Sequence, residues 1–173
     1  MLDTYKFIEK YKRISIIGME KNVGKTTLLN KLIADIGTNK KLGLTSIGRD
    51  GEDIDVVTNT DKPRIYVRRG SIIATGRNCL AKCDITKEIL YVTDFTTPMG
   101  SIVIVRALSD GYVDIAGPSY NKQVKIVVEL MEKFGSEISI VDGALGRKST
   151  AISDVSEATI LSTGAALSLD MLK

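Results

Sequence analysis

A short segment with glycine, lysine and threonine, residues 19–27, has the composition of a loop that holds a polyphosphate. It follows the apolar run 14–17 and precedes a stretch with apolar residues at helical spacing, namely Leu28, Leu29, Leu32, Ile33 and Ile36. Backbone N–H groups at the start of a helix converge on anions, and the helix dipole favours negative charge there. The segment therefore predicts a site for the phosphates of a nucleoside triphosphate.

Individual side chains of this loop have distinct chemical roles in that prediction. Lys25 would set a positive charge against the outer phosphates, and the hydroxyl of Thr26 would bind Mg²⁺. The strict glycine-rich pattern requires glycine or alanine where Met19 stands, so the segment matches it only from Gly24 onward. The residues expected to contact the nucleotide are Lys21, Asn22, Val23, Gly24, Lys25, Thr26 and Thr27.

Phosphoryl transfer also needs a carboxylate close to the phosphates. Asp142 follows the apolar run 138–141, so a predicted strand delivers it to the carboxyl edge of the sheet, where open α/β sheets bind ligands. There Asp142 would hold Mg²⁺ through water or orient the attacking water. Asp94 follows the run 89–93 in a similar way and competes for this role. We favour Asp142, because Pro98 and the glycine after it indicate a plain connection.

The exit from the second predicted strand is rich in acidic residues. Residues 48–55 contain two glycines and four acids within six positions, which is typical of a mobile loop. Asp50 is the residue that we expect to face the metal, and Arg49 is expected to contact the γ-phosphate or a substrate. Arg147 and Lys148, just beyond the late Asp-Gly pair, are further candidates for neutralising charge.

The order strand, loop, helix, strand at the start of the chain predicts an α/β fold whose mostly parallel sheet is flanked by helices. We expect a single domain over residues 1–173, or a piece of a longer chain, since the sequence ends abruptly after the predicted helix that begins at Gly164. The other predicted elements are an amphipathic piece at 3–12, strands at 14–17, 42–47, 138–141 and 158–161, and a helix at 120–134.

The middle third predicts antiparallel strands that extend this sheet. Runs at 65–67 and 72–74 flank a turn-like segment and suggest a β-hairpin. Another strand is expected at 89–93. Runs at 102–105 and 112–116 are joined through an Asp-Gly turn signal.

Composition narrows the class of protein. The chain has 43% hydrophobic and 26% charged residues and a net charge of +3, without a basic stripe interleaved with aromatic residues, so nucleic acid is not an expected partner. No apolar run approaches the length of a membrane span, and we expect a cytoplasmic protein. The absence of histidine excludes histidine-based catalysis.

The two cysteines of the chain lie four residues apart. Cys79 and Cys83 fall in a helix predicted at 77–85, where this spacing puts both on one face. A metal or redox pair is one interpretation, but the chain has no further cysteine or histidine to complete a four-ligand site. We favour two half-buried thiols.

The loop Lys21-Asn22-x-Gly24-Lys25-Thr26-Thr27 resembles that of MobB-type accessory GTPases, and the chain is similar to the MobB and dethiobiotin-synthetase (SIMIBI) side of the P-loop NTPases. The resemblance covers roughly residues 13–55 and 137–164. It implies the P-loop NTPase fold and a Walker A loop. MobB-type chains carry a Lys-His acidic loop at 48–55; this chain lacks histidine, which argues against a molybdopterin role.

Two shorter motifs give a narrower resemblance. Residues 45–52, Thr-Ser-Ile-Gly-Arg-Asp-Gly-Glu, and 141–144, Val-Asp-Gly-Ala, resemble P-loop accessory proteins of cobalamin-dependent lysine aminomutases. This resemblance implies a chaperone-like reactivase, whose nucleotide turnover would help to exchange damaged cobalamin in a partner enzyme. The aminomutase itself or a second accessory subunit would then be the protein partner.

The sequence leaves three functions open. The first is a Mg²⁺-dependent regulatory or accessory NTPase, in which Lys25, Asp50 and Asp142 are the catalytic residues, Thr26, Asp50 and Asp142 bind metal, and a homodimer is compatible. The second is an ATP-dependent small-molecule kinase or ligase of the dethiobiotin-synthetase kind, and the third is a non-catalytic nucleotide-binding scaffold. The segment 121–124 lacks the final aspartate of the guanine signature, so the choice between ATP and GTP stays open.

Overall fold

The computed structural model describes residues 4–18, 23–48, 64–144 and 155–163. The predictions for Lys21, Asn22, Arg49 and Asp50, for Arg147 and Lys148, and for a helix from Gly164 lie outside the described residues. The elements are α1 (Thr4–Ile8), β1 (Arg13–Gly18), α2 (Lys25–Ile36), β2 (Leu42–Ser46), β3 (Ile65–Val67), β4 (Ile72–Gly76), α3 (Arg77–Leu80), β5 (Lys87–Thr97), β6 (Gly100–Ala107), β7 (Gly111–Val113), α4 (Asn121–Lys133), β8 (Ile138–Ala144) and β9 (Ala158–Ser162).

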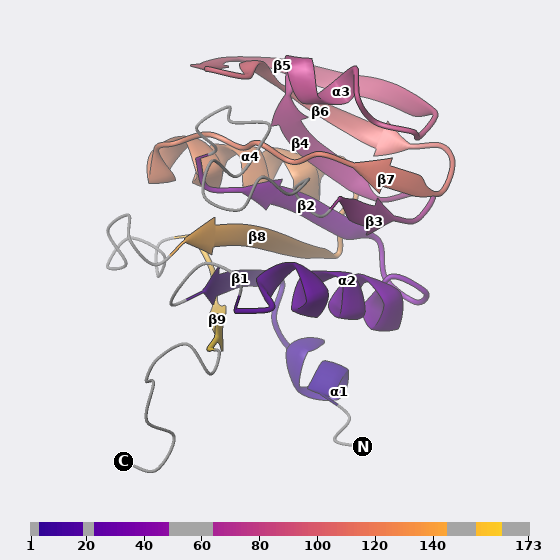
Figure 1. The fold of residues 1–173 in the computed structure, drawn as a ribbon, viewed down its shortest axis with the longest axis vertical. Helices are drawn as coiled ribbons and strands as arrows, with labels where there is room; N and C mark the ends of the chain where they lie inside the picture. Colours follow the sequence, from indigo (N-terminus) through magenta and orange to yellow (C-terminus); the bar gives the residue numbers. More distant parts are fainter. Residues whose placement is uncertain (1–3, 19–22, 49–63, 145–154, 164–173) are drawn as a thin grey trace.

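A seven-stranded sheet in the order β5-β6-β4-β2-β8-β1-β9 organises the fold (Figure 1). In the part of the sheet ordered β4-β2-β8-β1-β9, each strand is parallel to its neighbours. Strand β6 pairs antiparallel with both β4 and β5. The prediction of an α/β fold with a mostly parallel sheet and an antiparallel extension in the middle third is confirmed. The central parallel strands β1, β2, β4 and β8 are mostly apolar and buried because helices cover both of their faces, whereas β9 at the edge alternates between half-buried and exposed residues.

Helices α2 and α4 lie on opposite faces of the sheet (Figure 1). The apolar face of α2 packs with alternate residues of β1, β2 and β8 in one cluster, which also holds Ile8 of α1 and Leu80 of α3. The apolar face of α4 packs with the other face of β4, β6 and β8 in a second cluster. The helical spacing read from both segments thus predicted their buried residues, which are Leu29, Leu32, Ile33 and Ile36 in α2 and Val124, Val127, Val128 and Met131 in α4.

The predicted hairpin between 65–67 and 72–74 is wrong. Strand β3 pairs antiparallel with β7 in a separate two-stranded sheet, whereas β4 joins the main sheet beside β2. The proposed turn signal between 102–105 and 112–116 likewise joins strands of different sheets. Both errors have the same cause. The apolar runs correctly indicate strands, but which strand pairs with which depends on burying their apolar faces against residues far away in the sequence.

Two boundaries also differ from those expected. Helix α3 ends at Leu80, so Cys83 lies beyond it instead of on the same helical face as Cys79. Asp142 lies within β8 and not after it. In the N-terminal piece, the Phe7 ring contacts Tyr11 edge-on and is 62% exposed, whereas Ile8 is buried in the core.

None of the helices in the described ranges is long and apolar enough to cross a membrane.

Candidate functional site

Helix α2 begins at a glycine with a left-handed backbone conformation. Gly24 occupies the N-cap position of α2 with φ 80° and ψ 14°, in the left-handed region that favours glycine. No side chain caps this helix end. The first hydrogen bond of the helix runs from the N–H of Leu28 to the carbonyl of Gly24, at 2.9 Å. The N–H groups of the first turn of a helix have no partner within the helix itself. The N–H groups at this end of α2 are therefore not capped by a side chain.

Lys25 and Asp142, 117 residues apart in the sequence, meet at this junction. Lys25 Nζ lies 3.3 Å from Asp142 Oδ1 and donates a hydrogen bond of 3.0 Å to the carbonyl of Gly143. Both side chains are about one-quarter exposed, at 26% for Lys25 and 25% for Asp142, and the Oδ1 atom itself is buried. A partly buried ammonium beside a carboxylate at the mouth of a helix is a suitable arrangement for binding a phosphate together with a cation.

The sheet places this pair at its carboxyl edge. Asp142 lies between Ile16 of β1 and Ser46 of β2 in the parallel register. All three strands run in the same direction, so their ends open towards the start of α2 (Figure 1). Thr26, in the first turn of α2, is half-buried. The structure therefore brings together Gly24, Lys25 and Asp142, as the sequence predicted.

Strand β9 supplies a contact that the sequence analysis missed. The hydroxyl of Ser162, at the end of β9, donates a 2.6 Å hydrogen bond to the carbonyl of Val23, directly before Gly24. Strand β9 pairs with β1, so this hydrogen bond connects the residue before Gly24 to the strand next to β1. A serine following the run 158–161 was the available signal, since polar residues at parallel strand ends share one edge of the sheet.

A second missed feature is a segment that crosses the ends of β4 and β2. The Thr75 hydroxyl donates to the carbonyl of Asp114 at 3.0 Å, and the N–H of Gly117 donates to the Ser46 hydroxyl at 2.9 Å. At its far end the carbonyl of Pro118 accepts a 2.9 Å bond from the N–H of Gly48. We call residues 114–118 the crossing segment. It fixes the end of β2 beside Asp142.

Asp94, the competing carboxylate, lies elsewhere. It sits exposed on β5, which forms the opposite edge of the sheet from β9 and is separated from β8 by β6, β4 and β2. Of the two carboxylates, Asp142 is the one that lies beside Lys25. Residues 121–124, the imperfect guanine signature, form the first turn of α4.

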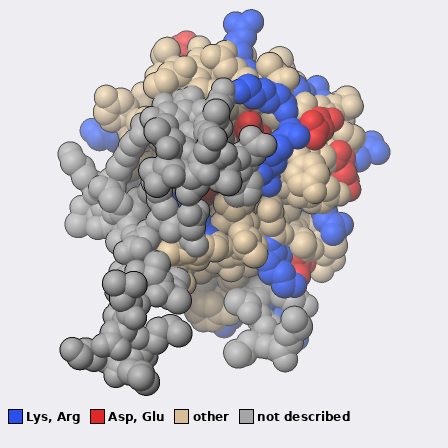
Figure 2. Space-filling model, in the orientation of Figure 1, with Lys and Arg blue, Asp and Glu red and all other residues tan. Residues whose placement is uncertain are grey.

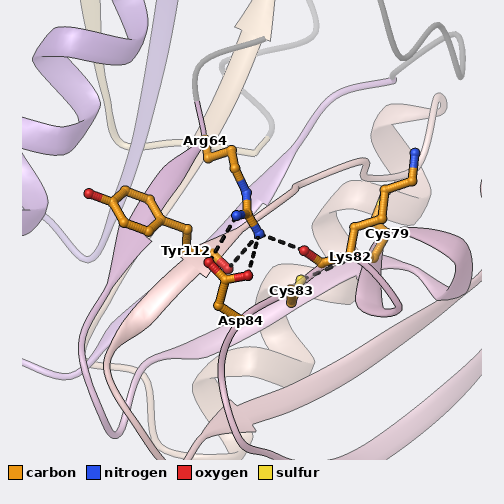
Figure 3. Close-up of polar contacts among 6 residues, drawn as sticks. All are labelled: Arg64, Cys79, Lys82, Cys83, Asp84 and Tyr112. Carbon is orange, nitrogen blue, oxygen red and sulfur yellow. Dashed lines mark hydrogen bonds and ion pairs between the residues drawn. The ribbon is translucent and has the colours of Figure 1, made fainter. Parts of the chain in front are cut away.

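The cysteines lie near a polar cluster centred on Arg64 (Figure 3). The guanidinium of Arg64 holds Asp84 through two bonds of 2.9 and 3.1 Å, and Cys83 Sγ donates to the carbonyl of Cys79 at 3.2 Å. Burial raises the pKa of the Cys83 thiol, which disfavours the reactive thiolate. Cys79 is buried. These features agree with the interpretation of two structural thiols.

Charged side chains of both signs share the visible face of the molecule. Figure 2 shows Lys and Arg side chains gathered on the right of this face with Asp and Glu among them. Across the residues that the structure describes, no group of three or more Cys, Asp and Glu is arranged to hold a metal ion.

Comparison with known proteins does not extend these observations, because no protein-family model, no curated protein and no solved structure matches this chain.

Proposed function

We propose that this chain binds a nucleoside triphosphate with Mg²⁺ at the carboxyl edge of β1 and β8, hydrolyses it, and acts as an accessory NTPase for a partner enzyme. The observation that carries the proposal is the meeting of Lys25 and Asp142 beside the left-handed Gly24. The two residues were singled out separately from the sequence, for different roles in one reaction. Their separation of 3.3 Å between Nζ and Oδ1 supports a common site.

In this proposal the protein contributes position and charge. The N–H groups at the start of α2 bind the phosphates, and Lys25 exchanges the carbonyl of Gly143 for a phosphate oxygen. Asp142 orients the attacking water, and together with Thr26 it offers the hard oxygen ligands that Mg²⁺ prefers. The ion, when bound, supplies charge neutralisation on the terminal phosphates.

Two further arguments favour an accessory role over the other two functions. The described chain leaves the end of β2, where Ser46 is the register neighbour of Asp142, through Ile47 and Gly48, and the acidic residues 50–55 follow in the sequence. A segment ordered by a terminal phosphate and released by hydrolysis is a common way to signal to a protein partner. The resemblance to aminomutase accessory proteins makes a cobalamin-dependent aminomutase the first partner to test.

Isothermal titration with ATP and GTP, each with Mg²⁺ and with chelator, tests the proposal. We expect binding of one nucleotide and slow hydrolysis that accelerates with a protein partner. Hydrolysis driven by a metabolite alone would favour the kinase or ligase instead. Failure of both nucleotides to bind in the presence of Mg²⁺ would overturn the proposal.

Asp142→Asn separates binding from turnover. The amide keeps the shape of the side chain but loses the charge, so we expect turnover to fall roughly 100-fold. Nucleotide affinity should change much less, because phosphate binding rests on Lys25 and the helix N-terminus. Asp35→Asn is a matched control, since Asp35 has a similar exposure of 26% and also pairs with a lysine, Lys31. Equal turnover in both variants would contradict the role of Asp142.

Ser162→Ala tests the support of the loop by β9. Loss of the hydrogen bond to the Val23 carbonyl leaves that group to water and frees the loop, so we expect about fivefold weaker nucleotide binding, close to 1 kcal/mol. Ser162→Thr retains the hydroxyl and should restore most of the affinity. Titration of both variants measures the effect, and an alanine variant that binds like the wild type would refute it.

A further inference from the structure

Strand β5 ends the main sheet on the side away from the candidate site. It is eleven residues long, and along its outer edge no strand of the described residues pairs with it. An edge strand presents backbone N–H and C=O groups that can pair with another strand. Figure 1 places β5 at the top of the molecule, with β9 near the bottom.

The middle of this edge strand is apolar and exposed. Ile89, Tyr91 and Val92 are 64%, 47% and 54% exposed, although they lie within four residues of one another. Single exposed apolar side chains are normal on a protein surface, but three within four residues of an open edge strand indicate a binding surface. Charged residues flank this group, with Lys87 and Glu88 before it and Asp94 after it, and the strand also contains the partly buried Phe95.

A bulge at Leu90 decides which faces these side chains share. Ile89 is opposite Val105 on β6, whereas Tyr91 is opposite Ile104 and Val92 opposite Val103. Val103 and Val105 belong to the cluster beneath α2. Ile89 and Val92 therefore lie on the same face of the sheet, in spite of their odd spacing.

The other face carries the remaining pair. Ile104 belongs to the cluster beneath α4, and Leu90 packs against that same cluster. The Tyr91 ring also contacts Phe134 there, with ring centroids 6.5 Å apart. Leu90 and Tyr91 thus share the α4 face of the sheet.

We propose that two copies of this chain form a homodimer through antiparallel pairing of their β5 strands, about a two-fold axis between Leu90 and Tyr91. In this register each Ile89 is opposite the Val92 of the second copy, and each Leu90 is opposite its Tyr91. Both pairs match in face and in apolar character. Counted along the strand from this axis, Lys87 is opposite Asp94, which lies in a second irregularity of β5 between Val92 and Thr96, so each end of the interface brings together a lysine and an aspartate.

Charge selects this register from its neighbours. Moving the axis by half a residue onto Tyr91 would set Glu88 opposite Asp94, two like charges. Moving it onto Leu90 would set Glu88 opposite Val92, a charge against an apolar side chain. Both are unfavourable cross-strand pairs, so the strand is complementary to itself in the proposed register.

The proposed interface is independent of the nucleotide site. The site lies at β8 and β1, and three strands separate β8 from β5. Pairing two β5 edges would join the two seven-stranded sheets into one and leave both sites open. The test of dimerisation therefore does not depend on whether the chain binds a nucleotide.

Charge reversal tests both the surface and the register in the full-length protein. Lys87→Asp gives two aspartates opposite each other at both ends of the dimer, and Asp94→Lys gives two lysines. By sedimentation equilibrium, we expect each single variant to dimerise roughly tenfold more weakly than the wild type. An equimolar mixture of the two variants should recover wild-type affinity, because each aspartate then meets a lysine.

The mixing step also controls for damage within one chain. Lys87 Nζ donates to the carbonyl of Leu80 at 2.7 Å, so Lys87→Asp loses this contact as well, and a fold damaged by that loss would not be repaired by mixing. Recovery supports the proposed register. Weak association in the mixture overturns it.

Ile89→Lys combined with Val92→Lys tests the apolar centre. Two lysines would face two lysines of the other copy, so we expect dimerisation to weaken by roughly 30-fold or more. Ile126→Lys is the matched control, because Ile126 is 44% exposed on α4 and away from this edge. A wild-type chain that stays monomeric at roughly 100 μM would overturn the proposal. So would a double variant that dimerises as tightly as the wild type. A β5 edge that binds a different protein while the chain stays monomeric would also overturn it.

Discussion

Lys25→Ala is expected to weaken nucleotide binding about 1,000-fold, which corresponds to about 4 kcal/mol. The ammonium group is the full positive charge at the start of α2 that already touches both Asp142 and the carbonyl of Gly143. Hydrogen bonds between charged groups are each worth about 1.5–3 kcal/mol, and Lys25 would make more than one to the phosphates. Titration of the variant with the preferred nucleotide and Mg²⁺ measures the loss.

The same variant should keep its fold. The Lys25 side chain is 26% exposed, so the ion pair with Asp142 is partly screened by water and its loss should cost about 1 kcal/mol. Lys31→Ala is the control, because Lys31 lies on the same helix and pairs with Asp35. We expect Lys31→Ala to bind nucleotide normally. Global unfolding of Lys25→Ala, or equal binding by both variants, would contradict the assignment.

The elements that the sequence predicted well are those with a local signal. The spacing of apolar residues in 28–36 and 124–131 is periodic within a few turns, so it fixes both the helix and its buried face. The parallel strands β1, β2 and β8 are short continuous apolar runs that the flanking turns delimit. Their order in the sheet did not follow from these runs, because it depends on contacts across the whole chain.

The errors in the middle third show the same limit. The run 65–67 is a strand as predicted, but its partner is β7, more than 40 residues away, rather than the next strand in the chain. A turn-like Arg-Arg-Gly-Ser segment is compatible with either partner. The degree of burial determines which sheet each strand joins. Strand β4 is fully buried in the main sheet between β2 and β6, whereas Tyr66 of β3 is only half-buried.

The sequence predicted those residues of the candidate site whose proposed role depends on the type of side chain. Lys25 and Asp142 were proposed because a lysine after glycine at a helix start and an aspartate after an apolar run are typical of phosphate and metal sites, and Asp94 matched the second of these patterns as well. Ser162 and the crossing segment were not recognised, because their contribution is a backbone contact. A peptide lying against a strand end leaves no distinctive pattern of residue types, and the serine after the run 158–161 indicates only a polar residue at the edge of the sheet, not the carbonyl that it contacts.

Gly117→Ala is expected to lower the free energy of unfolding by about 3 kcal/mol. A Cβ atom at this position would lie 1.8 Å from the carbonyl oxygen of Ser46 and 2.8 Å from the Thr45 hydroxyl oxygen. The first neighbour is backbone at the end of β2, so it cannot rotate away, and the crossing segment itself must move. For a chain of this size the melting temperature should fall by about 10 °C, as thermal unfolding would show.

The position of the clash connects stability with the site. Moving the crossing segment breaks the bond from Gly117 N–H to Ser46, and Ser46 is the neighbour of Asp142 in the parallel register. Nucleotide binding should therefore weaken in Gly117→Ala even below its melting temperature. Gly143→Ala is the control for glycine replacement, because its Cβ would meet Ile47 Cδ1 at 3.7 Å, an ordinary contact. If both variants melted together, close packing at Gly117 would not be what holds the end of β2 beside Asp142.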